Sequence, residues 1–158
     1  MSANVHDAII IGGGFAGTAM AYRLARRGAK VLLLEANGLA SGTSGACAGR
    51  AQVSESHPGL HLDLVLAGLA RLEGLEEELG CDVEWRRLGN IMLIRREDHW
   101  RWWTEQVAHL AARGVPAEMI GQQTLKETEP LLDAAGFLGA AWCLEGHLNP
   151  FKYCHAFA

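Results

Sequence analysis

The chain has 158 residues, enough for one domain with a hydrophobic core. Its formal net charge of −4 argues against a general nucleic-acid-binding or anionic-membrane-binding function. No apolar stretch approaches the roughly 20 residues of a membrane span. The apolar residues near the N-terminus belong to the fold rather than to a signal peptide, so we expect a soluble cytoplasmic protein without a transmembrane segment.

The first predicted elements form a strand, a turn, a helix and a second strand. Residues 8–11 are a short apolar run that predicts a buried strand, and the glycine-rich residues 12–17 follow it. A helical pattern then ends at Gly28, and a second apolar run at 31–34 leads into Glu35. This order of elements within about 30 residues is the context of a dinucleotide-binding fingerprint.

Each glycine of this turn has an expected function. Gly12 permits the tight turn, Gly14 lets the backbone approach a pyrophosphate, and Gly17 lets the helix pack closely on the strand. The helix N-terminus directs N–H groups and a partial positive charge at the phosphates. Glu35 lies where a carboxylate accepts hydrogen bonds from an adenosine ribose, and its negative charge disfavours a 2′-phosphate. An ordinary loop is the alternative, and both flanking strands favour the nucleotide site.

Residues 39–50 are dominated by small and hydroxyl-bearing side chains. Such a segment builds no core but suits a backbone that wraps closely around a ligand. Thr43 and Ser44 offer hydroxyl groups to phosphate oxygens, and Arg50 offers a cation nearby. A flexible surface linker is the alternative, and the position directly after Glu35 favours ligand contact.

Metal chemistry is not indicated by the cysteines or the histidines. The four cysteines form no C-x-x-C pair, and we expect reduced, mostly buried thiols at Cys47, Cys81, Cys143 and Cys154. His57 and His61 have helical spacing, but the proline and glycine at 58–59 interrupt a helix face. All seven histidines are therefore interpreted as surface or satisfied core residues.

Leucines at helical spacing over 62–79 predict a helix of the next region, with Gly80 as its C-terminal stop. Residues 83–85 and 91–94 predict strands that are joined through residues 89–90. A second helix then ends near Gly114. The apolar face of this helix consists of Trp100, Trp103, Val107 and Leu110. Their helical spacing predicts packing in the core or at an interface rather than an aromatic substrate cage.

A last helix begins at Asn149, a good N-cap, with Pro150 in the first helical position. It continues to residue 158 without a stop signal, and only two strands of a parallel sheet are recognisable before it. We therefore expect the chain to be the N-terminal part of a longer protein.

Residues 7–17, Glu35 and residues 41–49 resemble the FAD-dependent D-amino-acid oxidase superfamily. Within it, the chain is similar to the glycine oxidase and sarcosine oxidase branch. It most resembles the β-type subunits of dye-linked proline dehydrogenases, opine oxidases and hydrogen cyanide synthase. Weaker motifs at 87–91, 127–130 and 146–151 extend the resemblance over essentially the whole chain.

The resemblance implies FAD as cofactor, with the pyrophosphate over residues 12–17 and the adenosine ribose on Glu35. The residues after position 42 would approach the diphosphate, the ribityl chain or the isoalloxazine. The implied cofactor-binding set is Gly12, Gly14, Phe15, Ala16, Gly17, Glu35, Ala36, Thr43, Ser44, Ala48, Gly49 and Arg50. Cys47 is interpreted as a small packing residue. The resemblance implies no catalytic residue in this chain, because the catalytic groups of relatives lie mainly after the stretch that corresponds to residues 1–158.

The resemblance also implies an α/β fold in three stretches. Residues 1–53 form an FAD-binding, Rossmann-like βαβ unit with its flavin-contacting segment. Residues 54–146 form part of an α+β substrate or cap region, and 147–158 begin a helix that returns to the FAD-binding domain.

The implied activity is oxidation of the C–N bond of an amino or imino acid by hydride transfer to flavin N5. The implied partners are a small amino or imino acid substrate and subunits of a hetero-oligomeric dehydrogenase. A location peripheral to the inner membrane through an electron-acceptor partner is an alternative to the free cytoplasm. An NAD-linked dehydrogenase, which the 39–50 segment disfavours, and a non-catalytic FAD-binding or assembly subunit are the alternative functions.

Overall fold

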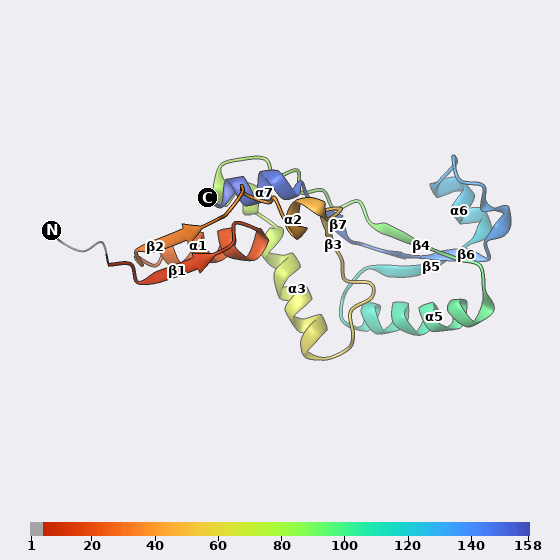
Figure 1. Ribbon diagram of the computed structural model, residues 1–158. Coiled ribbons are helices and arrows are strands. Elements are labelled where there is room, and N and C mark those ends of the chain that lie inside the picture. Colours follow the sequence, from red (N-terminus) through yellow and green to blue (C-terminus); the bar gives the residue numbers. More distant parts are fainter. Residues whose placement is uncertain (1–4) are drawn as a thin grey trace. The chain divides into compact units, whose positions relative to one another are not determined.

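The computed structural model describes residues 5–158, which divide into two compact units (Figure 1). Among the described residues, unit 1 contains 5–50, 71–86 and 147–158. Unit 2 contains residues 51–70 and 87–146. The domain boundaries drawn from the sequence at 53/54 and 146/147 remain a prediction.

Unit 1 is built on the predicted strand–helix–strand motif. Strand β1 (Ala8–Ile11) leads into helix α1 (Phe15–Ala25), and strand β2 (Val31–Leu34) returns parallel to β1, with Ala8 opposite Val31. These three elements are confirmed as the sequence predicts them. The unit also contains α2 (Thr43–Ala46), α4 (Leu75–Leu79) and α7 (Pro150–Ala156).

Strand β1 is not buried as the apolar run predicts. Only Ile10 is shielded, whereas Ile9 is 61% and Ile11 86% exposed. A parallel strand is buried when layers cover both of its faces and other strands cover its edges. Within the described residues β1 pairs with β2 alone, and α1 is the helix that packs against this pair.

The core of unit 1 joins stretches that are far apart in sequence. Leu75, Val83 and Phe157 are buried together, and the aromatic rings of Tyr22 and Phe157 lie edge to face with centroids 5.2 Å apart. Helix α7 begins as predicted, because Asn149 Oδ1 accepts hydrogen bonds from the backbone N–H groups of the next two non-proline residues. Its Pro150 occupies the first turn, where no N–H group is needed.

The single helix predicted over 62–79 is wrong. Helix α3 (Leu60–Leu72) ends before Gly74, which has φ +74°, and α4 begins after it. Glycine reaches this left-handed conformation without the strain of a Cβ atom, so it separates the two helices. The stop at Gly80 is confirmed, since this residue is the left-handed C-cap of α4.

The strand predicted at 83–85 is also wrong. These residues are irregular, and Glu84 itself has a positive φ of +60°. The strand predicted at 91–94 is confirmed as β4 (Asn90–Ile94), but its partner comes from a distant stretch, β6 (Gly139–Cys143). Pairing across this sequence distance cannot be deduced from local turn residues.

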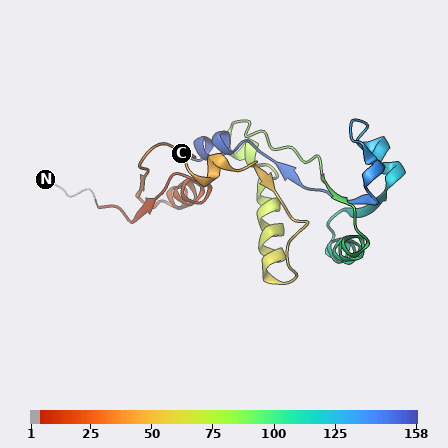
Figure 2. The same cartoon turned by 45° about the vertical axis from the view of Figure 1, so that its right-hand side comes forward.

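Unit 2 contains a three-stranded antiparallel sheet of order β4-β6-β5, where β5 is Ala117–Gly121. Helix α5 (Glu97–Ala112) packs along this sheet, and Figure 2 shows the helix nearly end-on. Trp103 is buried on α5 against Ile94 and Ala141, which confirms the packing interpretation of the tryptophan face.

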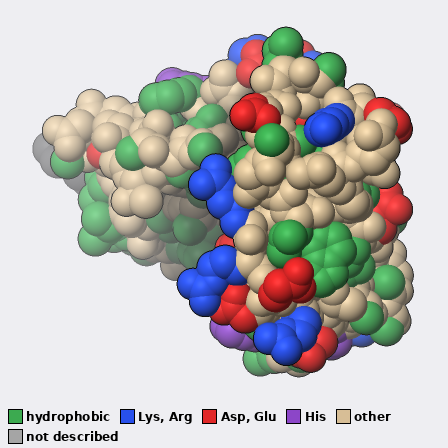
Figure 3. Space-filling view, turned by 90° about the vertical axis from the view of Figure 1, so that its right-hand side faces the viewer, with side chains coloured by type: hydrophobic (Ala, Val, Ile, Leu, Met, Phe, Trp, Pro, Cys, Tyr) green, Lys and Arg blue, Asp and Glu red, His purple; other side chains and the backbone are tan. Residues whose placement is uncertain are grey.

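The remaining elements are short. They are β3 (Arg50–Ala51), α6 (Gln122–Thr128), a 3-10 turn (Ala134–Gly136) and β7 (Gly146–His147). On the face shown in Figure 3, acidic and basic side chains are interspersed. Elsewhere in the described residues, Arg96 and Asp98 form an exposed ion pair. Within residues 5–158, no helix is both long and apolar enough to cross a bilayer.

Candidate functional site

The glycine turn between β1 and α1 brings strand and helix into close contact. Gly12 has φ +107°, and its N–H group donates to Leu34 O at 2.7 Å. A Cβ atom at Gly17 would lie 1.9 Å from Gly12 O, so only glycine fits there without moving the helix away from the strand. No atom lies within 4 Å of a Cβ position built on Gly12, so this part of the turn is open.

Glu35 reaches the turn from the end of β2. Its Oε2 atom accepts a hydrogen bond from Gly13 N at 2.7 Å, and Oε1 accepts one from Asn37 N at 3.0 Å. The hydrogen bonds from Asn37 and then Gly13 hold the pKa of Glu35 below its ordinary value, with a smaller contribution from the N–H group of Ala36. Glu35 is therefore an anchored anion, and each oxygen keeps a further lone pair for a ribose hydroxyl.

Ser44 reaches the same turn from α2. Its Oγ atom accepts a hydrogen bond from Phe15 N at 3.0 Å and lies 2.6 Å from the Cβ position of Gly14. The hydroxyl proton of Ser44 remains available for donation. The amides of Ala16 and Gly17 belong to the first helical turn and have no intrahelical acceptor. The turn thus combines N–H donors, a hydroxyl group and a backbone without side chains.

The Phe15–Ser44 contact was missed in the sequence, where only the hydroxyl pattern of residues 39–50 pointed to Ser44. Thr43, Ala48 and Arg50 have exposed positions on the same segment. Gly49 is buried with φ +70°, and a Cβ atom there would lie 2.0 Å from Leu148 O. The segment therefore rests against the residues that lead into α7.

The interpretation of Cys47 as a packing residue is wrong, because this residue is exposed. Its thiol donates to Ser44 O at 3.1 Å, and its sulfur accepts from Gly49 N at 3.4 Å, so it links the two ends of the turn after α2. Cys81 is also exposed. Cys143 and Cys154 are buried, and burial raises the pKa of Cys143 to about 12.

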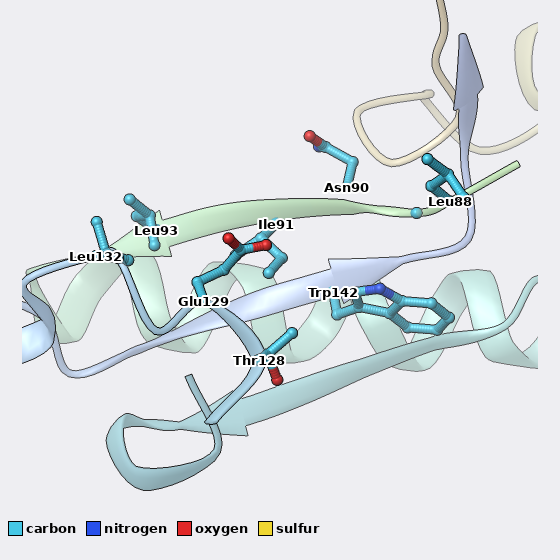
Figure 4. A pocket seen from close by; sticks show the side chains of 9 residues that line it. Leu88, Asn90, Ile91, Leu93, Thr128, Glu129, Leu132 and Trp142 are labelled. Atoms are coloured by element: carbon cyan, nitrogen blue, oxygen red, sulfur yellow. The ribbon is translucent and has the colours of Figure 1, made fainter. Parts of the chain in front are cut away.

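A second concave site lies within unit 2 (Figure 4). It is a pocket of about 410 Å³ between β4, β6 and the segment that follows α6. The weak motifs at 87–91 and 127–130, far apart in sequence, meet at this pocket. Its lining is mixed polar and apolar with one carboxylate and consists of Leu88, Gly89, Asn90, Ile91, Leu93, Thr128, Glu129, Leu132 and Trp142.

No group of three His, Cys, Asp or Glu side chains is placed to hold a metal ion in the part of the chain that the structure describes. The candidate site is the glycine turn with Glu35 and Ser44, because their polar groups meet there. Its donors suit an anionic phosphate group, and its carboxylate suits the hydroxyl groups of a sugar.

Comparisons with known proteins agree with this geometry. Residues 7–158 match the family model described as FAD dependent oxidoreductase. The pyruvate dehydrogenase phosphatase regulatory subunit of mouse mitochondria is 30% identical over 87% of this chain and 16% of its own length. Human mitochondrial dimethylglycine dehydrogenase is 31% identical over 96% of this chain and 18% of its own length.

Among solved structures, the glycine oxidase of Geobacillus kaustophilus has a TM-score of 0.88 and 27% identity. The match covers 97% of this chain and 43% of the oxidase. The chain thus spans less than half the length of these relatives. Because the family model covers nearly every residue and the fold is shared, the chain belongs to the FAD-dependent oxidoreductase family.

Proposed function

We propose that the protein binds FAD and oxidises the C–N bond of an amino or imino acid. The observation that carries the proposal is the convergence of the glycine turn, the anchored Glu35 carboxylate and the Ser44 hydroxyl. The relatives support the substrate class, because a glycine oxidase and a dimethylglycine dehydrogenase are both named for small amino acids. The family match supports FAD rather than NAD.

The residues of the turn fit the ADP portion of FAD. A Cβ atom on Gly14 would lie 2.6 Å from Ser44 Oγ, so glycine at this position lets the Ser44 hydroxyl group come close to the turn. We assign the pyrophosphate to residues 12–17 and the ribose hydroxyls to Glu35 and its neighbour Ala36. The Glu35 carboxylate has a fixed orientation, because both of its oxygens accept hydrogen bonds from backbone N–H groups.

The segment after position 42 would approach the rest of the cofactor. In the proposal Thr43 and Ser44 donate hydroxyl protons to phosphate oxygens, and Arg50 contributes positive charge. Ala48 and Gly49 present small surfaces to the ribityl chain or the isoalloxazine. When bound, FAD supplies the two-electron acceptor for the hydride of the substrate's α-carbon. The chain's own residues bind and orient it.

The test uses the protein expressed from its intact gene. We expect it to purify yellow and to release FAD, identified by chromatography, when it is denatured. In a separate sample of native protein, kept free of oxygen, addition of small amino and imino acids should bleach the flavin absorbance. Recovery of bound NAD without any flavin would contradict the proposal.

A non-catalytic FAD-binding subunit is a second candidate function, favoured by the similarity to a regulatory subunit. The same experiment separates the two functions. Stoichiometric FAD that no amino or imino acid reduces would support the regulatory function over the enzymatic one.

We further propose that the protein works in the cytoplasm with partner subunits of a hetero-oligomeric dehydrogenase. The resemblance of residues 7–17, Glu35 and residues 41–49 to β-type dehydrogenase subunits supports this assignment. Affinity purification from the source cells should recover such subunits in fixed stoichiometry. A homogeneous homo-oligomer that turns over substrate would contradict it.

A further inference from the structure

Glu84 has an unusual backbone conformation within unit 1. Its φ of +60° lies in the left-handed region, which glycine and asparagine tolerate and glutamate rarely adopts. The side chain of Asp82 supports the turn, because its Oδ1 atom accepts a hydrogen bond from Glu84 N at 2.7 Å. A non-glycine residue held in this region is strained, and such strain concentrates at functional sites.

The Glu84 carboxylate contacts the beginning of α7 through both oxygens. Oε1 lies 2.7 Å from Lys152 Nζ, and Oε2 accepts a hydrogen bond from Asn149 Nδ2 at 3.1 Å. Asn149 Oδ1 in turn accepts from the N–H groups of Phe151 and Lys152, each at 3.1 Å. Glu84 therefore fixes the orientation of the amide that caps α7.

The beginning of α7 touches the segment that we assign to the flavin. Leu148 N donates to Gly49 O at 2.9 Å, and a Cβ atom on Gly49 would lie 2.0 Å from Leu148 O. A Cβ atom on Gly45 would lie 2.9 Å from the ring of Phe151. Because the Gly49 backbone is hydrogen-bonded to Leu148 and closely approached by it, a shift at the start of α7 is expected to move Gly49 as well, while the Phe151 ring lies beside Gly45.

We propose that Glu84 is a positioning residue for FAD: through Asn149 and Lys152 it holds the first turn of α7 against Gly45 and Gly49. The inference rests on the proposed FAD site, since it concerns the shape of residues 43–50. A glutamate occupies a position where asparagine or glycine would be less strained, because only its longer, charged side chain reaches both donors on α7.

The central variant is Glu84→Asn, made in the protein expressed from its intact gene. Asparagine suits the left-handed backbone but is shorter and uncharged, so it cannot accept from both donors. We expect the apoprotein to unfold at the same temperature as the wild type or higher. The dissociation constant for FAD should rise about twofold to fivefold, the range of an exposed charged contact. The absorbance bands of the bound flavin should shift as well.

A second variant separates capping from positioning. Asn149→Ser keeps a side-chain oxygen for the α7 N-cap but loses the amide that donates to Glu84. We expect weaker FAD binding from this variant too, in the same direction as from Glu84→Asn. The matched control is Asp63→Asn, which breaks an exposed ion pair with Arg113 in unit 2 and should leave FAD affinity unchanged.

The outcomes distinguish the inference from the proposed function. Wild-type protein that takes up no FAD would refute the proposed function, and this inference with it. Wild-type and Glu84→Asn proteins with equal FAD affinity and identical flavin spectra would refute this inference alone. A loss of FAD affinity that merely follows a loss of apoprotein stability would also overturn it, because Glu84 would then be structural only.

Discussion

Replacement of Gly17 by alanine tests the close packing of α1 on β1. The new methyl carbon would lie 1.9 Å from Gly12 O and 3.0 Å from Gly12 C. Both are backbone atoms, and Gly12 is itself tied to β2 by its hydrogen bond to Leu34, so neither can rotate away. The helix must move outward by about 1.5 Å to restore van der Waals contact.

Overpacking of this kind destabilises by about 3 kcal/mol at the upper end of its usual range. The better helix propensity of alanine offsets about 1 kcal/mol of this loss, which leaves a net destabilisation of about 2 kcal/mol. The movement also distorts the glycine turn to which we assign the pyrophosphate, so FAD affinity should fall together with stability. Urea unfolding followed by circular dichroism measures the first effect, and fluorescence titration with FAD measures the second.

Gly68→Ala is the matched control. Gly68 is also a helical glycine, on α3, but no atom lies within 4 Å of its Cβ position. Alanine should therefore stabilise the protein there by about 0.5–1 kcal/mol and leave FAD affinity unchanged. If Gly17→Ala is as stable as the wild type, or if both variants change stability by the same amount, the packing argument is refuted.

Three further predictions concern charge and exposure. Glu35→Ala should weaken FAD binding about tenfold in equilibrium dialysis, since it removes charge-assisted hydrogen bonds to the ribose; unchanged affinity would exclude Glu35 as the acceptor. The hydrogen bond from Arg96 lowers the pKa of Asp98 from 3.8 to about 2. The Arg96–Asp98 pair therefore contributes to stability above about pH 4, and this contribution is lost as the pH falls towards 2. Asp98→Asn should remove that part of the acid dependence, and an NMR titration of Asp98 with a midpoint near 4 would contradict it. A thiol reagent should modify Cys47 and Cys81 rapidly, and Cys143 and Cys154 only after unfolding; four equally fast thiols would contradict the burial.

Local patterns predicted the parts of the fold that local interactions determine. The βαβ unit follows from apolar runs around a glycine turn, and the α7 cap follows from the chemistry of Asn149 and Pro150. The break at Gly74 was missed because the leucine pattern continues across it, although a glycine in a helical pattern is a known point of interruption.

Contacts between residues that are distant in the chain could not be predicted from the sequence. The pairing of β4 with β6 and the bond from Phe15 N to Ser44 Oγ depend on how the chain folds back. The strain at Glu84 likewise has no local signal, since glutamate is a poor candidate for a left-handed backbone. The cofactor residues themselves stay a prediction that FAD binding will test.

The core of unit 1 also bears on how the protein is made. Tyr22 on α1 packs against Phe157, which follows α7, and Phe15 at the start of α1 packs against Tyr153. At a translation rate of about 5–20 residues per second, roughly 7–27 s separate the synthesis of Tyr22 from that of Phe157. During that interval α1 lacks its aromatic partners while Ile9 and Ile11 of β1 are exposed. The aromatic packing of α1 in unit 1 therefore forms only after α7 and Phe157 have been synthesised.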